Sequence, residues 1–155
     1  SNFQAILLGS DQGRKVYSKK LLNLVERYSL TKKINFISNC QEMPLAYSLA
    51  DVVVSASTEP EAFGRVAVES QSMGKPIVAS NIGGSKETIL NKKSGFLYKH
   101  DDPRELAKNL NTVIQLSQEE LKLIGNEGRK NVTKKFDVEI MCDSNLREYK
   151  KLLNY

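Results

Sequence analysis

Short apolar segments alternate with segments of helical periodicity along most of the chain. The apolar segments are rich in Ile and Val, which predicts strands at residues 5–8, 34–37, 52–55, 77–79 and 95–98. Between them, apolar residues recur at i, i+3, i+4 and i+7, the spacing of one helix face. This spacing predicts helices at residues 15–29, about 42–49 and 64–73.

The predicted strands are apolar throughout rather than alternating, which is typical of a parallel sheet covered on both faces. Strands that alternate with helices then predict a doubly wound α/β domain. The last third of the chain differs, because residues 103–116, 118–134 and 138–153 all show helical patterns. Ser117 and Asp137 stand at N-cap positions before two of these helices. We therefore expect residues 1–155 to form one domain with a helical C-terminal tail.

Composition narrows the class of protein. The chain has 155 residues, of which 40% are hydrophobic and 26% charged, as expected for one globular domain with a real core. No apolar run approaches the roughly 20 residues that a membrane-spanning helix needs. Two cysteines and one histidine, without ligand-like spacing, argue against a metal site and a disulfide framework. We expect a cytoplasmic protein that binds no metal and no separate cofactor.

The formal net charge is +5, and basic residues concentrate late in the chain, at Lys122, Arg129, Lys130, Lys134, Lys135, Arg147, Lys150 and Lys151. No aromatic residues interleave with these basic residues, so the pattern does not favour nucleic-acid binding. The main interpretation is a solvated helix face. The alternative is weak, peripheral contact with the inner face of a membrane.

The segment from residue 59 to residue 80 carries the candidate chemistry. Glu61 and Glu69 stand eight positions apart, which limits their separation to about 12 Å at a helical rise of about 1.5 Å per residue. Between them, Phe63, Gly64 and Arg65 offer backbone N–H groups at a helix N-terminus, where phosphate binds. A phosphate between two carboxylates that can bind hydroxyls suggests a nucleotide-sugar. The alternatives are a helix-start acid at Glu61 and a salt bridge or an exposed position at Glu69.

Two glycine-containing loops follow predicted strands. Gly9 begins the sequence Gly-Ser-Asp-Gln-Gly, which predicts a tight turn into the first helix, with a place in the donor cleft as the alternative. Gly83 and Gly84 precede a short predicted helix, and the interpretations are a second anion site or a simple turn with Ser85 as N-cap. Lys75 is expected in a surface turn.

Several separate motifs resemble one enzyme family. The family's motifs are matched by Tyr-x-x-Ala-Asp at 47–51, Glu-Ala-Phe-Gly-x-x-x-x-Glu at 61–69, Met-Gly-Lys-Pro-Ile-Val-Ala-Ser at 73–80 and Gly-Gly-x-x-Glu at 83–87. In this order they resemble the C-terminal, nucleotide-sugar-binding domain of GT-B glycosyltransferases of family 4, also called glycosyl transferases group 1. The resemblance covers nearly the whole chain, from Leu-Leu-Gly at 7–9 to Gly-Phe-Leu-Tyr at 95–98. It implies that the doubly wound sheet is the Rossmann-like donor half of such an enzyme.

The resemblance also implies roles for individual residues. Glu69 would hold the ribose hydroxyls of the nucleotide, and Glu61 would contact hydroxyls of the transferred sugar. The sugar and the diphosphate would face the backbone amides of Phe63, Gly64, Arg65 and Val66. The base would pack against Ser38, Asn39 and Cys40, where Ser38 replaces a glycine that is frequent in the family. Arg65 is expected either to contact phosphate or to point outward.

The expected function is the donor half of a retaining glycosyltransferase that moves a hexosyl unit from an NDP-sugar to a glycan or lipid-linked acceptor. Polysaccharide or lipopolysaccharide biosynthesis is the pathway class that the resemblance implies. The N-terminal acceptor domain of the family has no counterpart here. Ser1 and Asn2 look like a remnant of cloning, so we expect a fragment of a longer protein that transfers nothing alone. The alternatives are a nucleotide-sugar 2-epimerase of the same fold and a non-catalytic binding module.

Overall fold

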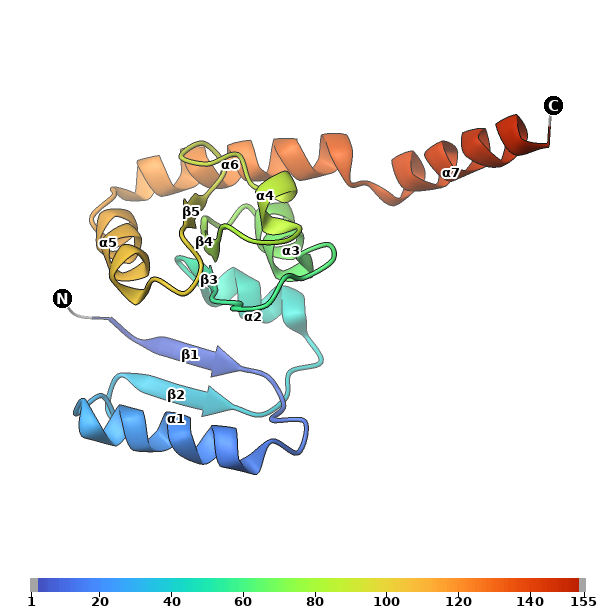
Figure 1. The fold of residues 1–155 in the computed structure, drawn as a ribbon. Coiled ribbons are helices and arrows are strands. Elements are labelled where there is room, and N and C mark those ends of the chain that lie inside the picture. The colour runs from blue at the N-terminus through green and yellow to red at the C-terminus, as the bar shows by residue number, and fades with distance from the viewer. Residues whose placement is uncertain (1–2, 154–155) are drawn as a thin grey trace. The chain divides into compact units, whose positions relative to one another are not determined.

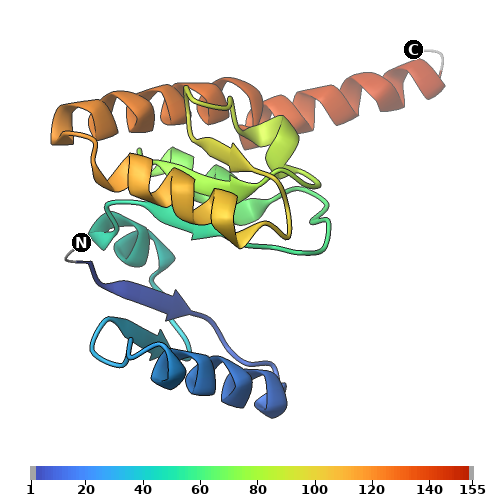
Figure 2. The same ribbon diagram turned by 60° about the vertical axis from the view of Figure 1, so that its left-hand side comes forward.

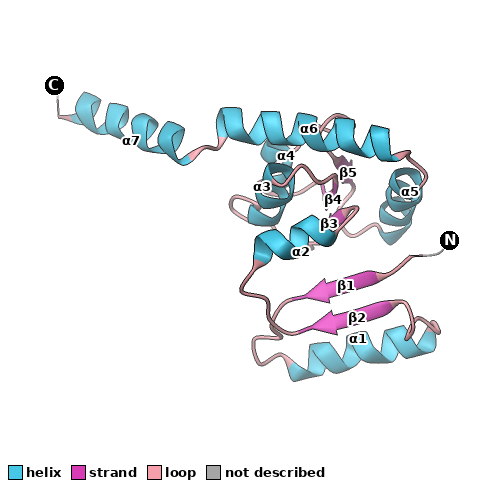
Figure 3. Cartoon of the chain, turned by 180° about the vertical axis from the view of Figure 1, so that it is seen from behind, coloured by secondary structure: helices cyan, strands magenta, loops and turns pink. Residues whose placement is uncertain are grey.

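The computed structural model describes residues 3–153, so the expectation for Ser1 and Asn2 lies outside the described residues. The chain divides into two compact units, residues 1–46 and 47–155. Strands and helices alternate from residue 5 to residue 114, and two further helices follow, as Figure 1 and Figure 3 show. All strand pairs in the two units are parallel. The predicted α/β class with parallel sheets is therefore confirmed.

The first unit contains a two-stranded sheet and one long helix. The strands β1 (Ala5–Leu8) and β2 (Ile34–Ile37) pair in parallel, and α1 (Lys15–Arg27) connects them. The expected burial of these strands on both faces is not found, since Ile6 is 57% exposed and Phe36 41%. Both faces of a sheet are buried only when other elements cover each of them. Among residues 3–46, α1 is the one long helix that can cover a face.

The second unit contains a three-stranded parallel sheet in the order β3 (Val53–Ser55), β4 (Ile77–Ser80), β5 (Phe96–Tyr98). The central strand β4 is buried along its whole length, as its apolar sequence predicts. The helices are α2 (Met43–Leu49), which crosses the division between the units, α3 (Arg65–Ser72), α4 (Ser85–Thr88), α5 (Pro103–Ile114), α6 (Gln118–Lys135) and α7 (Val138–Leu152). Two apolar clusters, one around Ile77 and one around Val78, form the core of this unit.

Helix α6 packs closely on α3 because two of its residues are glycines. A Cβ at Gly125 would lie 1.9 Å from the Gly74 carbonyl oxygen, and one at Gly128 would lie 3.0 Å from Cγ of Gln71. The contact also contains a buried polar link. The carbonyl oxygen of Thr88 in α4 accepts hydrogen bonds of 2.9 Å from Nε2 of Gln71 and from Nδ2 of Asn131 in α6. Figure 2 shows α6 running along the second unit above these elements.

Local capping sets the helix boundaries close to the predicted ones. Ser117 forms a capping box with Glu120, and its hydrogen bonds lower the pKa of the Glu120 carboxyl. Asp137 accepts a hydrogen bond from the Glu139 amide, so both predicted N-caps are confirmed. The interpretation of Ser85 as N-cap is wrong: Gly84 occupies the cap position and Ser85 is the first helical residue. No helix among residues 3–153 is long and apolar enough to cross a membrane.

Candidate functional site

Two loops meet at the carboxyl edge of the second sheet. Strands β3 and β4 are parallel, so the loops that follow them leave the sheet at the same edge. The Gly84 amide donates a 2.9 Å hydrogen bond to the carbonyl oxygen of Glu61. A Cβ at Gly83 would lie 2.4 Å from that same oxygen, and one at Gly84 would lie 2.3 Å from the Phe63 carbonyl oxygen. Only glycines allow the two backbones to approach so closely.

Helix α3 begins at this junction with its N-terminus free of side-chain capping. Gly64 occupies the N-cap position in the left-handed region, with φ of 77°, and no side-chain hydrogen bond caps the helix there. The first amides of an α-helix have no partner within the helix, so those around Arg65 and Val66 are available to an anion. Phe63 is 45% exposed and makes an edge-to-face contact with Phe136, with ring centroids 5.6 Å apart. The predicted donor-binding residues 63–66 thus occupy one helix start.

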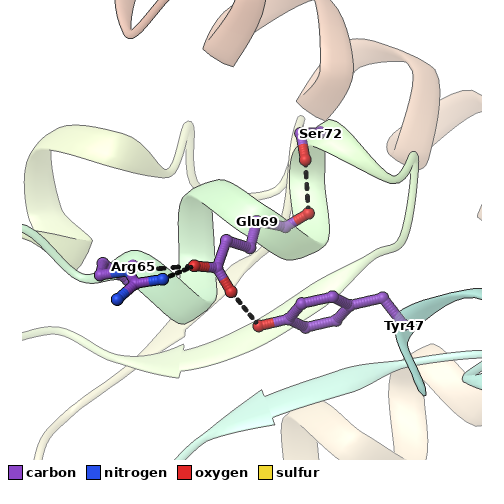
Figure 4. Close-up of polar contacts among 4 residues, drawn as sticks. All are labelled: Tyr47, Arg65, Glu69 and Ser72. Atoms are coloured by element: carbon purple, nitrogen blue, oxygen red, sulfur yellow. Dashed lines mark hydrogen bonds and ion pairs between the residues drawn. The ribbon is translucent and has the colours of Figure 1, made fainter. Parts of the chain in front are cut away.

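Glu69 lies one turn further along α3, and both of its carboxylate oxygens accept hydrogen bonds (Figure 4). Oε1 accepts from Nε and Nη2 of Arg65 at 3.0 and 2.8 Å, and Oε2 accepts from the Tyr47 hydroxyl at 2.9 Å. The Glu69 side chain is 32% exposed and that of Arg65 is 83% exposed. The salt bridge predicted as one alternative for Glu69 is therefore present, and Arg65 points outward, as its own alternative predicts.

Glu61 lies in the loop before α3 and is exposed. Its Oε1 accepts a hydrogen bond from the Ser57 hydroxyl, and its backbone binds the Gly84 amide as described above. Along the chain, Glu61 thus precedes the start of α3 and Glu69 follows it.

The remaining predicted site residues belong to the first unit. Gly9 follows β1, and its amide donates a 2.9 Å hydrogen bond to the carbonyl oxygen of Ile37 at the end of β2. This bond brings Gly9 next to the segment that contains Ser38, Asn39 and Cys40. The predicted tight turn is present, because the Gly13 amide donates to Oδ1 of Asp11.

Sequence reasoning gave no role to Tyr47 and Ser57, although each donates to one of the two carboxylates. Ser57 lies four residues before Glu61, so the sequence could have indicated this contact through a local turn. Tyr47 lies 22 residues before Glu69, and its position in a motif was the only signal. Lys75 lies in a turn, and its Nζ donates a 2.8 Å hydrogen bond to the Ser48 carbonyl oxygen in α2. Among residues 3–153, no three His, Cys, Asp or Glu side chains cluster as a metal site would require.

Comparison with known proteins matches the chain to a family. The family model described as glycosyl transferases group 1 matches residues 1–131. A curated relative, the capsular polysaccharide biosynthesis glycosyltransferase CapM of Staphylococcus aureus, is 32% identical over 87 residues. That alignment covers 56% of this chain and 22% of the relative.

Two solved structures have the same fold across almost the whole chain. A glycosyltransferase from Rickettsia africae superposes with a TM-score of 0.93 and 31% identity, covering 98% of this chain and 40% of that one. The Anabaena protein Alr3699/HepE, solved in complex with UDP, gives a TM-score of 0.87 and 31% identity, with coverages of 99% and 41%. The same protein has been solved with UDP-glucose. The chain thus spans about two fifths of each of these proteins.

Proposed function

Because the chain belongs to the glycosyl transferases group 1 family, we propose that it is the nucleotide-sugar-binding half of a retaining glycosyltransferase. The observation that carries this proposal is the placement of Glu69 one turn beyond the open N-terminus of α3. A carboxylate there can accept hydrogen bonds from ribose hydroxyls while the diphosphate lies against the helix start. The solved complexes of Alr3699/HepE with UDP and UDP-glucose support a uridine nucleotide as the first donor to test.

Glu61 takes the sugar end of the donor in this proposal. Its exposed carboxylate lies before the helix start, and the Ser57 hydroxyl and the Gly84 amide hold its side chain and its backbone. An exposed carboxylate can accept hydrogen bonds from hydroxyls of the transferred hexosyl unit. In the first unit, Gly9 and the segment 38–40 would contact the base and the adjoining part of the donor.

Chemistry at such a site rests on positioning and on stabilising negative charge. The departing diphosphate gains charge as the bond to the sugar breaks, and the amides and dipole at the start of α3 stabilise that charge. The Arg65 guanidinium, four residues before Glu69, is an exposed positive charge at the same place. These groups supply the positive charge that a metal ion would otherwise supply, so we propose transfer without a bound metal.

For the acceptor we propose a chemical class, and for the enzyme a cellular compartment. The similarity to a capsular polysaccharide glycosyltransferase supports a glycan or lipid-linked acceptor in polysaccharide or lipopolysaccharide biosynthesis. The acceptor would bind to a further domain, since the chain spans about two fifths of the solved relatives. We propose a cytoplasmic enzyme whose basic C-terminal helices contact the inner face of the membrane.

Nucleotide binding by the chain itself tests the proposal. Saturation-transfer NMR with UDP, GDP, ADP and their sugar conjugates detects complexes with a Kd of about 1 mM, or about −4 kcal/mol of binding free energy. We expect transfer to one nucleoside diphosphate and its loss in Glu69→Ala. The matched control is Glu119→Ala, which removes an exposed carboxylate from the first turn of α6. Absence of transfer to every nucleotide, or equal transfer from the native and the Glu69→Ala proteins, would contradict the proposed site.

A further inference from the structure

The carboxylate of Glu69 is already occupied from two sides, by partners that differ in burial. Tyr47 binds Oε2 and is 6% exposed, whereas Arg65 binds Oε1 through a side chain that is 83% exposed (Figure 4). The first partner comes from α2 and the second from the preceding turn of α3. One partner is thus fixed by packing, and the other is held only by the ion pair.

Tyr47 is fixed by the elements around it. It lies near the end of α2, and the Lys75 ammonium group anchors the following residue by binding the Ser48 carbonyl oxygen at 2.8 Å. Burial, with the hydrogen bond to Glu69, raises the pKa of the Tyr47 hydroxyl above its ordinary value. The hydroxyl therefore stays protonated at neutral pH and remains a donor to Glu69.

The acceptor positions of Glu69 decide which partner can leave. An ionised carboxylate has about four lone-pair positions, and the Tyr47 hydroxyl and the two Arg65 N–H groups fill three of them. A ribose diol brings two hydroxyl donors, so at least one existing bond has to break. Exposed Arg65 can turn into water or toward a phosphate, while a buried hydroxyl that lost its partner would be left unsatisfied. Arg65 is therefore the partner that gives way.

We infer that Tyr47 is a positioning residue for donor recognition, which holds Oε2 of Glu69 in place while a ribose hydroxyl replaces Arg65 at Oε1. The inference rests on the proposed function, because it assumes that Glu69 binds the ribose. Without the Tyr47 hydroxyl, the carboxylate turns toward Arg65 and loses the orientation that suits the diol. The guanidinium released by the diol is then free to approach the diphosphate at the start of α3.

The test compares two ligands that differ only at the ribose. UDP and 2′,3′-dideoxy-UDP are titrated into the whole chain by NMR, and the ratio of their Kd values measures the contribution of the diol. We expect the native protein to prefer UDP by about tenfold, as for a hydrogen bond to a charged group. Tyr47→Phe keeps the ring that fills the buried site and is expected to lower the ratio at least threefold, with unchanged affinity for the dideoxy ligand. Tyr98→Phe, at a second buried tyrosine, is expected to leave the ratio unchanged.

The outcomes separate this inference from the proposed function. A native protein with no preference for UDP would overturn both, since Glu69 would then not bind the diol. A preference that survives Tyr47→Phe would overturn the positioning role alone, and so would an equal loss of affinity for both ligands, which indicates a structural effect. The Nε–H signal of Arg65 reports the exchange: we expect UDP to shift it more than the dideoxy ligand does. Equal shifts would overturn the release of Arg65.

Discussion

At the scale of single residues, the candidate site depends on backbone contacts that leave no room for a side chain. Gly84 has an ordinary φ of −61°, so its backbone conformation would suit any residue. A glycine is needed there because the Cβ of any other residue would lie 2.3 Å from the Phe63 carbonyl oxygen, which is too close. The adjacent Gly83 needs both the space and its φ of 55°.

Gly84→Ala is therefore expected to separate the two loops and to weaken nucleotide binding severely, at a cost in unfolding free energy of about 2 kcal/mol. The matched control is Gly74→Ala, where φ is 67° but nothing lies within 4 Å of the added Cβ. This control costs about 1 kcal/mol of backbone strain and should leave binding intact. Denaturant unfolding and nucleotide titration of both proteins measure the difference. Equal loss of binding in both would show that the contact between the loops does not shape the site.

Sequence reasoning located the residues of the site better than their partners. Glu61, Glu69 and the glycine between them lie within one short segment, so their spacing along a loop and helix could be read directly. The Tyr47 hydroxyl reaches Glu69 across 22 positions of sequence, and a contact between two helices has no local pattern. The Arg65–Glu69 pair was readable in principle, because residues four apart share a helix face.

At the scale of elements, caps and periodicity gave helix ends within two residues for most helices. The N-caps Ser117 and Asp137 act through their own next turn, so local sequence contains all the information needed. The burial of β1 and β2 was not predictable in the same way, because it depends on which layers cover the sheet. The short helix α4 was expected after Gly83 and Gly84, whereas its contacts, the close approach at Gly84 and the bonds to the Thr88 carbonyl oxygen, join it to other segments of the chain.

Helix α7 leaves the body of the second unit, as Figures 1 and 2 show. None of its side chains is buried. Four of its exposed apolar residues form two pairs at helical spacing, Val138 with Met141 and Tyr149 with Leu152. Removal of residues 138–155, with Phe136 retained, is expected to change the melting temperature by less than about 3 °C, the shift for a surface change. Thermal unfolding followed by circular dichroism measures this. A larger drop would mean that α7 stabilises the rest of the chain.

At the scale of the whole molecule, the apolar core lies in the second unit. Both clusters of buried apolar residues consist of residues 52–121, whereas Val25 is the one buried side chain among residues 3–46. Tyr47, Glu61 and Glu69 also belong to the second unit. Its folding should therefore be sufficient to form the carboxylate site.

A chain of residues 42–155 is accordingly expected to fold cooperatively and to keep the hydrogen bond between Tyr47 and Glu69. Residues 1–46 alone should remain unfolded, because a chain this short buries too little surface to fold without a metal, disulfide or partner. Two-dimensional amide NMR spectra of the two pieces distinguish these states by their signal dispersion. A collapsed spectrum for residues 42–155 would show that the first unit is required for the fold of the second.

The carbonyl oxygen of Thr88 has a consequence for how this protein could be engineered. It binds the Gln71 amide, and Gln71 follows Glu69 by two residues, about 200° around the helix at 3.6 residues per turn. The hydrogen bond from Gln71, on the inner side of α3, therefore helps to hold the direction in which the Glu69 side chain leaves the opposite side. The bonds of Gln71 and Asn131 to Thr88 and the packing of Ala67 in the apolar cluster around Ile77 hold this rotation together. A design that raises heat tolerance by changing the aliphatic core should therefore keep both Gln71 and the close packing around Ala67, so that the Glu69 side chain still leaves the helix in the same direction.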